Sequence, residues 1–259
     1  MKVYEEFKDA CTREISAQGR DKNLRQLTRR WMNSANLFNY SYHFKWLGRP
    51  IIQYPQDIVS MQELIWSIKP DLIIETGIAH GGSLIFSASM LALLDLCETL
   101  DKGVAYDVKN SHRKVVGIDI DIRKHNRRMI QLHPLASYIE MIEGSSVASE
   151  TITRVASVAK NYERILVCLD SNHTHDHVLA ELEAYAPLVS MGSYCVVFDT
   201  IIEDMPNNAF PDRPWGVGNN PKTAVQEYLE RHPEFEIDKD IQEKLLITVA
   251  SDGYLKKVG

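Results

Sequence analysis

The sequence predicts a doubly wound α/β fold built on a mostly parallel, seven-stranded sheet. Short apolar runs alternate with stretches of helical periodicity through the middle of the chain, as they do in successive β-α-β units. Near the end, two further apolar runs are separated only by a short charged link. Strands joined so closely form an antiparallel hairpin, so five parallel strands are expected to be followed by a terminal hairpin.

The 259 residues suit one large α/β domain with an extension. We expect an N-terminal helical extension over residues 1–50 and the sheet domain over residues 51–259. The apolar residues of the extension recur at roughly helical spacing: Leu24, Leu27, Trp31 and Leu37. One or two amphipathic helices are therefore predicted. Packing on the core is their simplest role, and covering the substrate site or a subunit interface is the alternative.

The elements of the sheet domain follow in order. An irregular, aromatic connection over 38–57 leads into a helix around 58–65, which ends before Pro70. Buried strands are predicted at 71–75, 115–119, 138–142, 164–169 and 193–198. Helices are predicted at 82–97, 122–132, 147–160, 175–186 and 221–231. The terminal hairpin is expected from 235–238 and 244–250, and the polar stretch near 98–113 is interpreted as an insertion.

Composition and charge exclude several classes of protein. The net charge of −6 gives no support for nucleic acid or an anionic membrane as the main partner. No apolar run reaches the roughly 18 residues that a membrane span needs. The polar N-terminus does not resemble a secretory signal. The cysteines form no CxxC pair, and we expect neither a disulfide nor a zinc site, as in a cytoplasmic protein. They are Cys11, Cys97, Cys168 and Cys195.

A glycine-rich turn follows the first strand of the sheet domain. It contains four candidate cofactor-binding residues: Glu75, Gly77, His80 and Ser83. Ligands of open α/β sheets bind outside the carboxyl ends of the strands, and glycine lets the backbone approach a ligand closely. The turn alone suits NAD, FAD or a phosphate as well as S-adenosylmethionine. It has no lysine of the GxxxxGK[ST] type, which argues against an NTPase.

The next two strands supply further candidates for the cofactor site. Asp119 and Ile120 stand at the end of the second strand, where a carboxylate can accept hydrogen bonds from both ribose hydroxyls. The alternative for Asp119 or Asp121 is a helix N-cap, and we favour Asp121 as the cap. The third strand ends in small residues that could border an adenine, with capping of the next helix as the alternative for either serine. These residues are Gly144, Ser145 and Ser146.

Two acids, Asp170 and Asp199, end the fourth and fifth strands. Carboxylates at adjacent strand ends converge, and they suit Mg²⁺, which can lower the pKa of a bound hydroxyl. His173 is a candidate general base for that proton. His177 lies one turn further on, so we expect both histidines on the same side of a helix. The alternatives are a zinc or iron site that uses both histidines, and a helix cap at Asp170 or Ser171 without catalysis.

A long segment rich in Pro, Gly and Asn follows the fifth strand, and we interpret it as a mobile lid over residues 203–222. Trp215 in this segment could stack on a sugar ring or another flat apolar face. We therefore take Trp215 and His177 as candidate substrate residues. Asn220 and Pro221 are the expected cap and first turn of the following helix.

The motifs spread over residues 40–259 resemble the cephalosporin hydroxylase / rhamnosyl O-methyltransferase family. They are PDLIIETGIAHGGS, GIDID, EGSS, LDSNHTHDHV, VVFDT, RPWGVGNNPKTAV and DGYLKK. The resemblance implies a class I methyltransferase fold, S-adenosylmethionine, and Mg²⁺ held where Asp170 and Asp199 stand. The acid that often precedes the second of these in the family is Phe198 here, so water or substrate completes the metal's ligands. In the similar catechol O-methyltransferases a lysine base stands at the position of His173.

The expected function is Mg²⁺-assisted transfer of a methyl group from S-adenosylmethionine to a hydroxyl of a sugar or natural-product scaffold. The resemblance also implies a homo-oligomer. One alternative is an iron-dependent hydroxylase that uses His173 and His177. The other is a non-catalytic binding module that keeps the fold for a partner.

Overall fold

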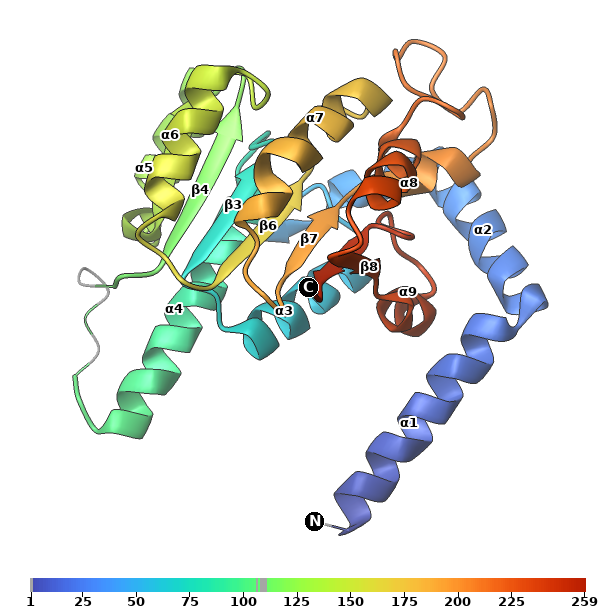
Figure 1. Cartoon of the computed structure of the whole chain (residues 1–259), viewed down its shortest axis with the longest axis horizontal. Coiled ribbons are helices and arrows are strands. Elements are labelled where there is room, and N and C mark those ends of the chain that lie inside the picture. Colours follow the sequence, from blue (N-terminus) through green and yellow to red (C-terminus); the bar gives the residue numbers. More distant parts are fainter. Residues whose placement is uncertain (1, 106, 108–110) are drawn as a thin grey trace.

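A seven-stranded sheet forms the centre of the protein in the computed structural model, which describes residues 2–105, 107 and 111–259. The strand order is β5-β4-β3-β6-β7-β9-β8, and the first five strands in this order are parallel. β9 runs antiparallel to both of its neighbours. The predicted seven-stranded, mostly parallel sheet is confirmed (Figure 1). The strands are β3 (Leu72–Thr76), β4 (Lys114–Asp119), β5 (Ile139–Glu143), β6 (Ile165–Leu169), β7 (Tyr194–Val197), β8 (Phe235–Ile237) and β9 (Tyr254–Lys257).

Helices cover both faces of the sheet (Figure 1). Residues of α3, α4, α5 and α9 pack in one apolar cluster with one face, and residues of α6, α7 and α8 pack in a second cluster with the other. These helices are α3 (Pro55–Ile68), α4 (Gly82–Lys102), α5 (Lys124–Gln131), α6 (Ser149–Ala159), α7 (His175–Tyr185), α8 (Pro221–Arg231) and α9 (Lys239–Leu245). The short 3₁₀ turns are η1 (Tyr40–His43), η3 (Ala136–Tyr138), η4 (Ala186–Leu188) and η5 (Thr200–Asp204).

The continuous apolar runs of the central strands arise from this layering. On β3, Ile73 belongs to one cluster, whereas Leu72 and Ile74 belong to the other. Side chains alternate between the faces of a strand, so a strand buried on both faces needs an apolar residue at every position. All three of these side chains are fully buried. The uninterrupted apolar runs that predicted the strands therefore supply side chains to both apolar clusters, one on each face of the sheet.

Two helices precede the sheet domain, as predicted: α1 (Lys2–Arg20) and α2 (Lys22–Asn36). Asp21 caps α2 by accepting hydrogen bonds from the amides of Asn23 and Leu24. α1 projects from the body of the molecule (Figure 1) and contacts α9, where Gln18 donates to the carbonyl of Glu243. A short antiparallel pair, β1 (Lys45–Trp46) and β2 (Arg49–Pro50), follows in the connection that was predicted to be irregular.

Among the described residues, one helix, α4, is long and apolar enough by length and composition to cross a membrane, and 44% of its apolar window is buried in the protein. Leu84, Leu91 and Leu94 on this helix are at most 1% exposed, and they pack in the cluster beneath the sheet. Packing against the sheet accounts for these apolar residues. The helix continues to Lys102, into the stretch near 98–113 that we interpreted as an insertion, and residues 106 and 108–110 of that stretch lie outside the described residues.

The structure corrects the predicted terminal hairpin. Residues 239–245 form α9 instead of a short link, and the last strand is Tyr254–Lys257 instead of 244–250. Asp238 caps α9 by accepting a hydrogen bond from the amide of Asp240. The charged residues that we interpreted as a link therefore form a short helix. An aspartate at the N-cap position, such as Asp238, is a sequence signal for the start of a helix. The antiparallel pairing of the last two strands is confirmed.

One predicted helix cap is wrong, one is confirmed, and the capping roles that we held as alternatives are not seen. Arg123, not Asp121, is the N-cap residue of α5. The N-cap residue of α6 is Ala148, so neither Ser145 nor Ser146 caps that helix. The N-cap residue of α7 is Thr174, so neither Asp170 nor Ser171 caps that one. Side chains that end parallel strands face the rim of the sheet, and this leaves them available for other contacts. Asn220 does cap α8, in a capping box with Thr223.

Asp57 on α3 is fully buried and accepts hydrogen bonds from the Thr248 hydroxyl, the Val249 amide and the Tyr254 hydroxyl. Burial raises the pKa of Asp57 from 3.8 to about 6, against the lowering effect of these hydrogen bonds. The folded state therefore binds this proton more tightly than the unfolded state does. The stability that the proton contributes is present below pH 4 and is lost as the pH rises through 6.

We expect Asp57→Asn to remove this pH dependence. In urea unfolding, the wild type should lose about 3 kcal/mol relative to the variant between pH 4 and pH 7, from the shift in pKa. Asp101→Asn, an exposed acid near the end of α4, should give a curve parallel to the wild type. Parallel curves for Asp57→Asn as well would show that the pKa of Asp57 is ordinary in the folded protein.

Candidate active site

A pocket of about 610 Å³ opens at the carboxyl ends of the central strands. Gly77, Asp170 and Asp199 come from the ends of β3, β6 and β7, which are neighbours in the sheet, and all three line this pocket. Parallel strands deliver their carboxyl ends to one edge. The structure therefore brings together the glycine turn and the two acids that the sequence singled out.

Gly77 allows the turn after β3 to lie directly against the loop after β6. Its φ of 89° is in the left-handed region, which glycine adopts without strain. A Cβ added here would overlap the carbonyl of Asp170. The Gly77 amide in turn donates to the carbonyl of Ile118 on β4 (2.8 Å). Any side chain at position 77 would thus push apart the two loops that carry the candidate cofactor and metal residues.

Asp119, at the end of β4, holds the same turn from the other side. Its Oδ2 accepts hydrogen bonds from the amides of Ile78 (2.8 Å) and Ala79 (3.2 Å), and its Oδ1 accepts one from Asp121 (3.1 Å). An ionised carboxylate offers about four acceptor positions, so roughly one stays available for a ligand. Asp119 therefore shapes the glycine turn in addition to any contact with a ribose.

Glu75 lies beneath the turn, where it is 4% exposed and accepts a hydrogen bond from the Ser83 hydroxyl. Burial raises the pKa of Glu75 to about 8, so this group is mostly protonated at neutral pH. Ser83 and His80 line the pocket, whereas Glu75 does not. The His80 carbonyl accepts hydrogen bonds from the buried Arg49 guanidinium, which holds the turn against β2.

The predicted adenine side lies at the same rim but outside the lining of the main pocket. Ile120 is 75% exposed. Gly144 and Ser145 follow β5, the neighbour of β4, at the carboxyl edge of the sheet. Ser146 is buried, and its hydroxyl lies 3.0 Å from His177 Nε2. The structure thus extends the rim from the pocket towards β5.

Asp170, His173 and Asp199 form a compact cluster whose potential ligand atoms all lie within 4.8 Å of one another. His173 Nε2 is 3.6 Å from Asp170 Oδ1 and 3.2 Å from Asp199 Oδ2. Asp199 has a left-handed backbone (φ 56°), a conformation that is uncommon for residues other than glycine and that recurs at functional sites. Two carboxylates and an imidazole fit a divalent cation.

The electrostatics of the cluster favour a bound proton or cation. The pKa of Asp170 is raised to about 6, because burial and the charge of the neighbouring Asp199 together outweigh the lowering effect of the hydrogen bond to His173. Burial alone would lower the pKa of His173, but the charges of Asp199 and Asp170 outweigh this and raise the pKa to about 9. The carboxylates therefore hold His173 as imidazolium until another positive charge replaces that proton.

Gln53 joins this cluster and was missed by the sequence analysis. Its Nε2 donates to Asp170 Oδ2 (3.2 Å), and its side chain lines the pocket. Its Oε1 is buried without a hydrogen-bond partner among the described residues. A buried acceptor without a partner, on a side chain that contacts the Asp170 carboxylate, is a place where a cation or its water would supply the missing contact. A glutamine in an irregular connection carries no sequence signal for this role.

His177 lies apart from the cluster, which corrects the prediction that the two histidines share one helix face. His173 precedes α7, which begins at His175. The His177 ring faces Ser171 (3.2 Å) and Glu181 (3.5 Å), and it is not part of the pocket lining. Within the described residues, the potential metal cluster contains His173 and not His177. The two-histidine metal site is therefore not assembled.

Trp215, in the segment after η5, lines the pocket, and its role as a substrate residue stays a prediction. Its ring lies 4.8 Å from the ring of His173, and Arg213 lies 5.2 Å over it. Trp215 Nε1 is buried without a hydrogen-bond partner among the described residues. An orphan donor on a flat apolar ring can bind a hydroxyl oxygen while the ring packs against a sugar face.

Comparison with known proteins places the chain in a family. The sequence model of the family described as Rhamnosyl O-methyltransferase/CmcI matches residues 38–258. The chain belongs to this family. The predicted family is confirmed, and so is the predicted class of enzyme, an O-methyltransferase dependent on S-adenosylmethionine, at the level of the family. The iron-dependent hydroxylase is not favoured.

Curated relatives of the family come from mycobacteria. A rhamnosyl O-methyltransferase of Mycobacterium tuberculosis strain H37Rv is 28% identical over 200 residues, which cover 77% of this chain and 72% of the relative. The rhamnosyl O-methyltransferase of Mycobacterium leprae is 28% identical over 214 residues, covering 81% of each chain. A solved structure of CmcI with Mg and SAM has a TM-score of 0.54 at 17% identity, covering 84% of this chain and 78% of that one, which supports the fold.

The cluster predicts stabilisation by a divalent cation. A hundredfold excess of Mg²⁺ or Mn²⁺ over its dissociation constant should raise the midpoint of thermal unfolding by roughly 5–10 °C. Asp199→Asn should abolish this increase because it removes one of the two carboxylates. Asp176→Asn, an exposed acid on α7, is the matched control and should retain it. An equal increase in the Asp199 variant would place the cation elsewhere.

Proposed function

We propose that this protein transfers a methyl group from S-adenosylmethionine to a hydroxyl of a sugar, with assistance from Mg²⁺. The observation that carries the proposal is the cluster of Asp170, His173 and Asp199 in one pocket with the glycine turn. The relatives named rhamnosyl O-methyltransferase support a sugar acceptor. The solved structure of CmcI with Mg and SAM supports both cofactors.

Each residue of the site has a distinct role in this proposal. The turn at Gly77 and the carboxylate of Asp119 would hold S-adenosylmethionine, which when bound would supply the electrophilic methyl group. Asp170 and Asp199 would hold Mg²⁺, which when bound would lower the pKa of an acceptor hydroxyl. Methyl transfer is an in-line displacement, so the fixed placement of the two reactants at one sheet edge contributes much of the rate.

His173 accepts the proton of the acceptor hydroxyl at Nε2. This nitrogen faces both carboxylates, so it lies where a hydroxyl held between them would release its proton. The same carboxylates hold the imidazole in its protonated form. Neutralising their charge removes the cause of the raised pKa and frees the imidazole to act as a base. His173 is thus a base rather than a third metal ligand in this proposal.

Binding of S-adenosylmethionine tests the cofactor half. Titration calorimetry should show binding to the wild type and a roughly 10- to 100-fold weaker affinity for Asp119→Ala, since the variant loses a charged acceptor and the anchor of the 77–79 turn. Asp121→Ala removes an exposed acid two residues away and should bind as the wild type does. Unchanged affinity in Asp119→Ala would reject its role in the cofactor site.

Product formation tests the chemical half. Mass spectrometry of p-nitrophenyl α-L-rhamnoside incubated with enzyme, S-adenosylmethionine and Mg²⁺ should show the gain of one methyl group. We expect His173→Ala to lower kcat by about 10²- to 10⁴-fold and to keep the thermal stabilisation by Mg²⁺. His125→Ala, an exposed histidine on α5, is the control. Loss of Mg²⁺ stabilisation in His173→Ala would make His173 a metal ligand instead of the base.

A further inference from the structure

Helix α2 lies outside the part of the chain that matches the family, which begins at residue 38. Nevertheless, its last turn and the residues after it line the pocket. They are Asn33, Asn36, Leu37, Asn39, Ser41 and Tyr42. The glycine turn and the metal cluster lie on other walls of the same pocket, so this wall faces the space that the two cofactors leave for the acceptor.

The inner face of α2 is fixed to the sheet domain by aromatic packing. Asn33 and Asn36 are three residues apart, so both lie on one side of the helix. The Tyr54 hydroxyl donates to Asn36 Oδ1, and the ring of Trp31 meets that of Tyr54 edge-on at 6.2 Å. Met32 is 3% exposed. The two amides are therefore held at defined positions in the pocket wall rather than on a freely moving helix.

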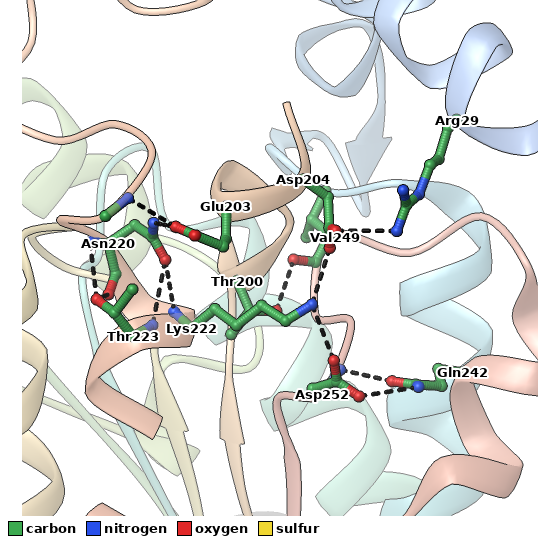
Figure 2. A network of polar contacts seen from close by, with 11 residues as sticks. Arg29, Thr200, Glu203, Asp204, Asn220, Lys222, Thr223, Gln242, Val249 and Asp252 are labelled. Carbon is green, nitrogen blue, oxygen red and sulfur yellow. Dashed lines mark hydrogen bonds and ion pairs between the residues drawn. The ribbon is translucent and has the colours of Figure 1, made fainter. Parts of the chain in front are cut away.

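A chain of ion pairs joins α2 to the opposite wall, as Figure 2 shows. Arg29 on α2 pairs with Asp204 at the end of η5 (2.9 Å), and Lys222 on α8 pairs with the same carboxylate (2.8 Å). Lys222 also pairs with Asp252 (2.8 Å), to which Gln242 of α9 is hydrogen-bonded. Asp204 thus sits between a cation from the N-terminal helix and a cation anchored in the C-terminal part of the domain.

The segment held by this bridge carries the pocket's apolar wall. Met205, Phe210 and Trp215 follow η5 and line the pocket. Glu203, next to Asp204, fixes the far end of the segment. It accepts a hydrogen bond from the Gly218 amide, and a second one from the Asn220 side chain, which Figure 2 shows. The bridge therefore sets the spacing between an amide-bearing wall on α2 and an aromatic wall on the 205–215 segment.

We propose that α2 is the acceptor-recognition wall of this pocket, and that Arg29 is a positioning residue that holds it against the 205–215 segment through Asp204. The proposal rests on the proposed function and deepens it, because it assigns the selection of the acceptor to residues outside the family's matched region. Amides on one side can bind neighbouring hydroxyls, and aromatic rings on the other can pack against C–H groups. That combination suits a glycoside.

Charge reversal on α2 tests the positioning role of Arg29. Arg29→Glu places a like charge against Asp204 and should raise the KM for p-nitrophenyl α-L-rhamnoside at least fivefold, with kcat and the affinity for S-adenosylmethionine unchanged. Arg29→Lys should restore the wild-type KM. Arg25→Glu is the matched control: it makes the same change one turn earlier on α2, at an exposed arginine outside the pocket lining, and should keep the wild-type KM. Equal effects of Arg29→Glu and Arg25→Glu would overturn the proposal.

A substitution of one of the α2 side-chain amides is a second test of the proposal. Asn33→Ala should raise the KM for the rhamnoside and leave the affinity for S-adenosylmethionine intact. An unchanged KM in this variant would overturn the recognition role of α2. Failure of the proposed function has a different signature, because the wild type itself would then neither bind S-adenosylmethionine nor methylate the glycoside.

Hydrogen exchange tests, without any acceptor substrate, whether the ion pairs of Asp204 with Arg29 and Lys222 hold the two walls together. In the wild-type enzyme with S-adenosylhomocysteine, backbone amides of α2 and of residues 205–215 should exchange slowly. Arg29→Glu should accelerate exchange in both segments, whereas Arg25→Glu should accelerate it in neither. Unchanged exchange in the 205–215 segment of Arg29→Glu would show that the ion pair does not hold the two walls together, and it would overturn the positioning role.

Discussion

The close approach of the turn at Gly77 to the loop at Asp170 is the constraint on which the site depends. Only a residue without a Cβ lets these two backbones meet. The approach sets the distance between the end of β3, where a cofactor would lie, and the end of β6, where the metal cluster begins. Asp119 reinforces it from β4 by binding two amides of the turn. A small shift of either loop would separate the two halves of the reaction.

The cluster at the rim is electrostatically incomplete by itself. His173 lies within 3.6 Å of Asp170 and 3.2 Å of Asp199. The unpaired Oε1 of Gln53 belongs to the side chain that donates to Asp170 in this partly buried site. Buried charges are tolerated when they are paired or bind a metal. In the function that we propose, a divalent cation would supply the missing positive charge, and His173 would then be free to accept a proton.

The pocket is also assembled from two layers of different origin. The sheet edge contributes the chemistry, whereas α2 and the segment after η5 enclose the remaining space. The ion pairs around Asp204 tie these covering elements to one another and to α8. Partly exposed ion pairs contribute little to global stability, but they can fix the relative position of two walls. The site thus combines a metal cluster and a glycine turn at the sheet edge with separate elements that enclose the rest of the pocket.

Local patterns in the sequence were enough to predict the buried strands, the glycine turn and the acids at the strand ends, because apolar runs and turn residues are local signals. The sequence did not reveal α9 behind a charged link, nor that His177 faces Ser171 and Glu181 instead of the metal cluster. Nor could it place Gln53 beside Asp170 or α2 over the pocket. Those contacts join residues far apart in the chain, and only tertiary packing, which has no local periodicity, decides which of them meet.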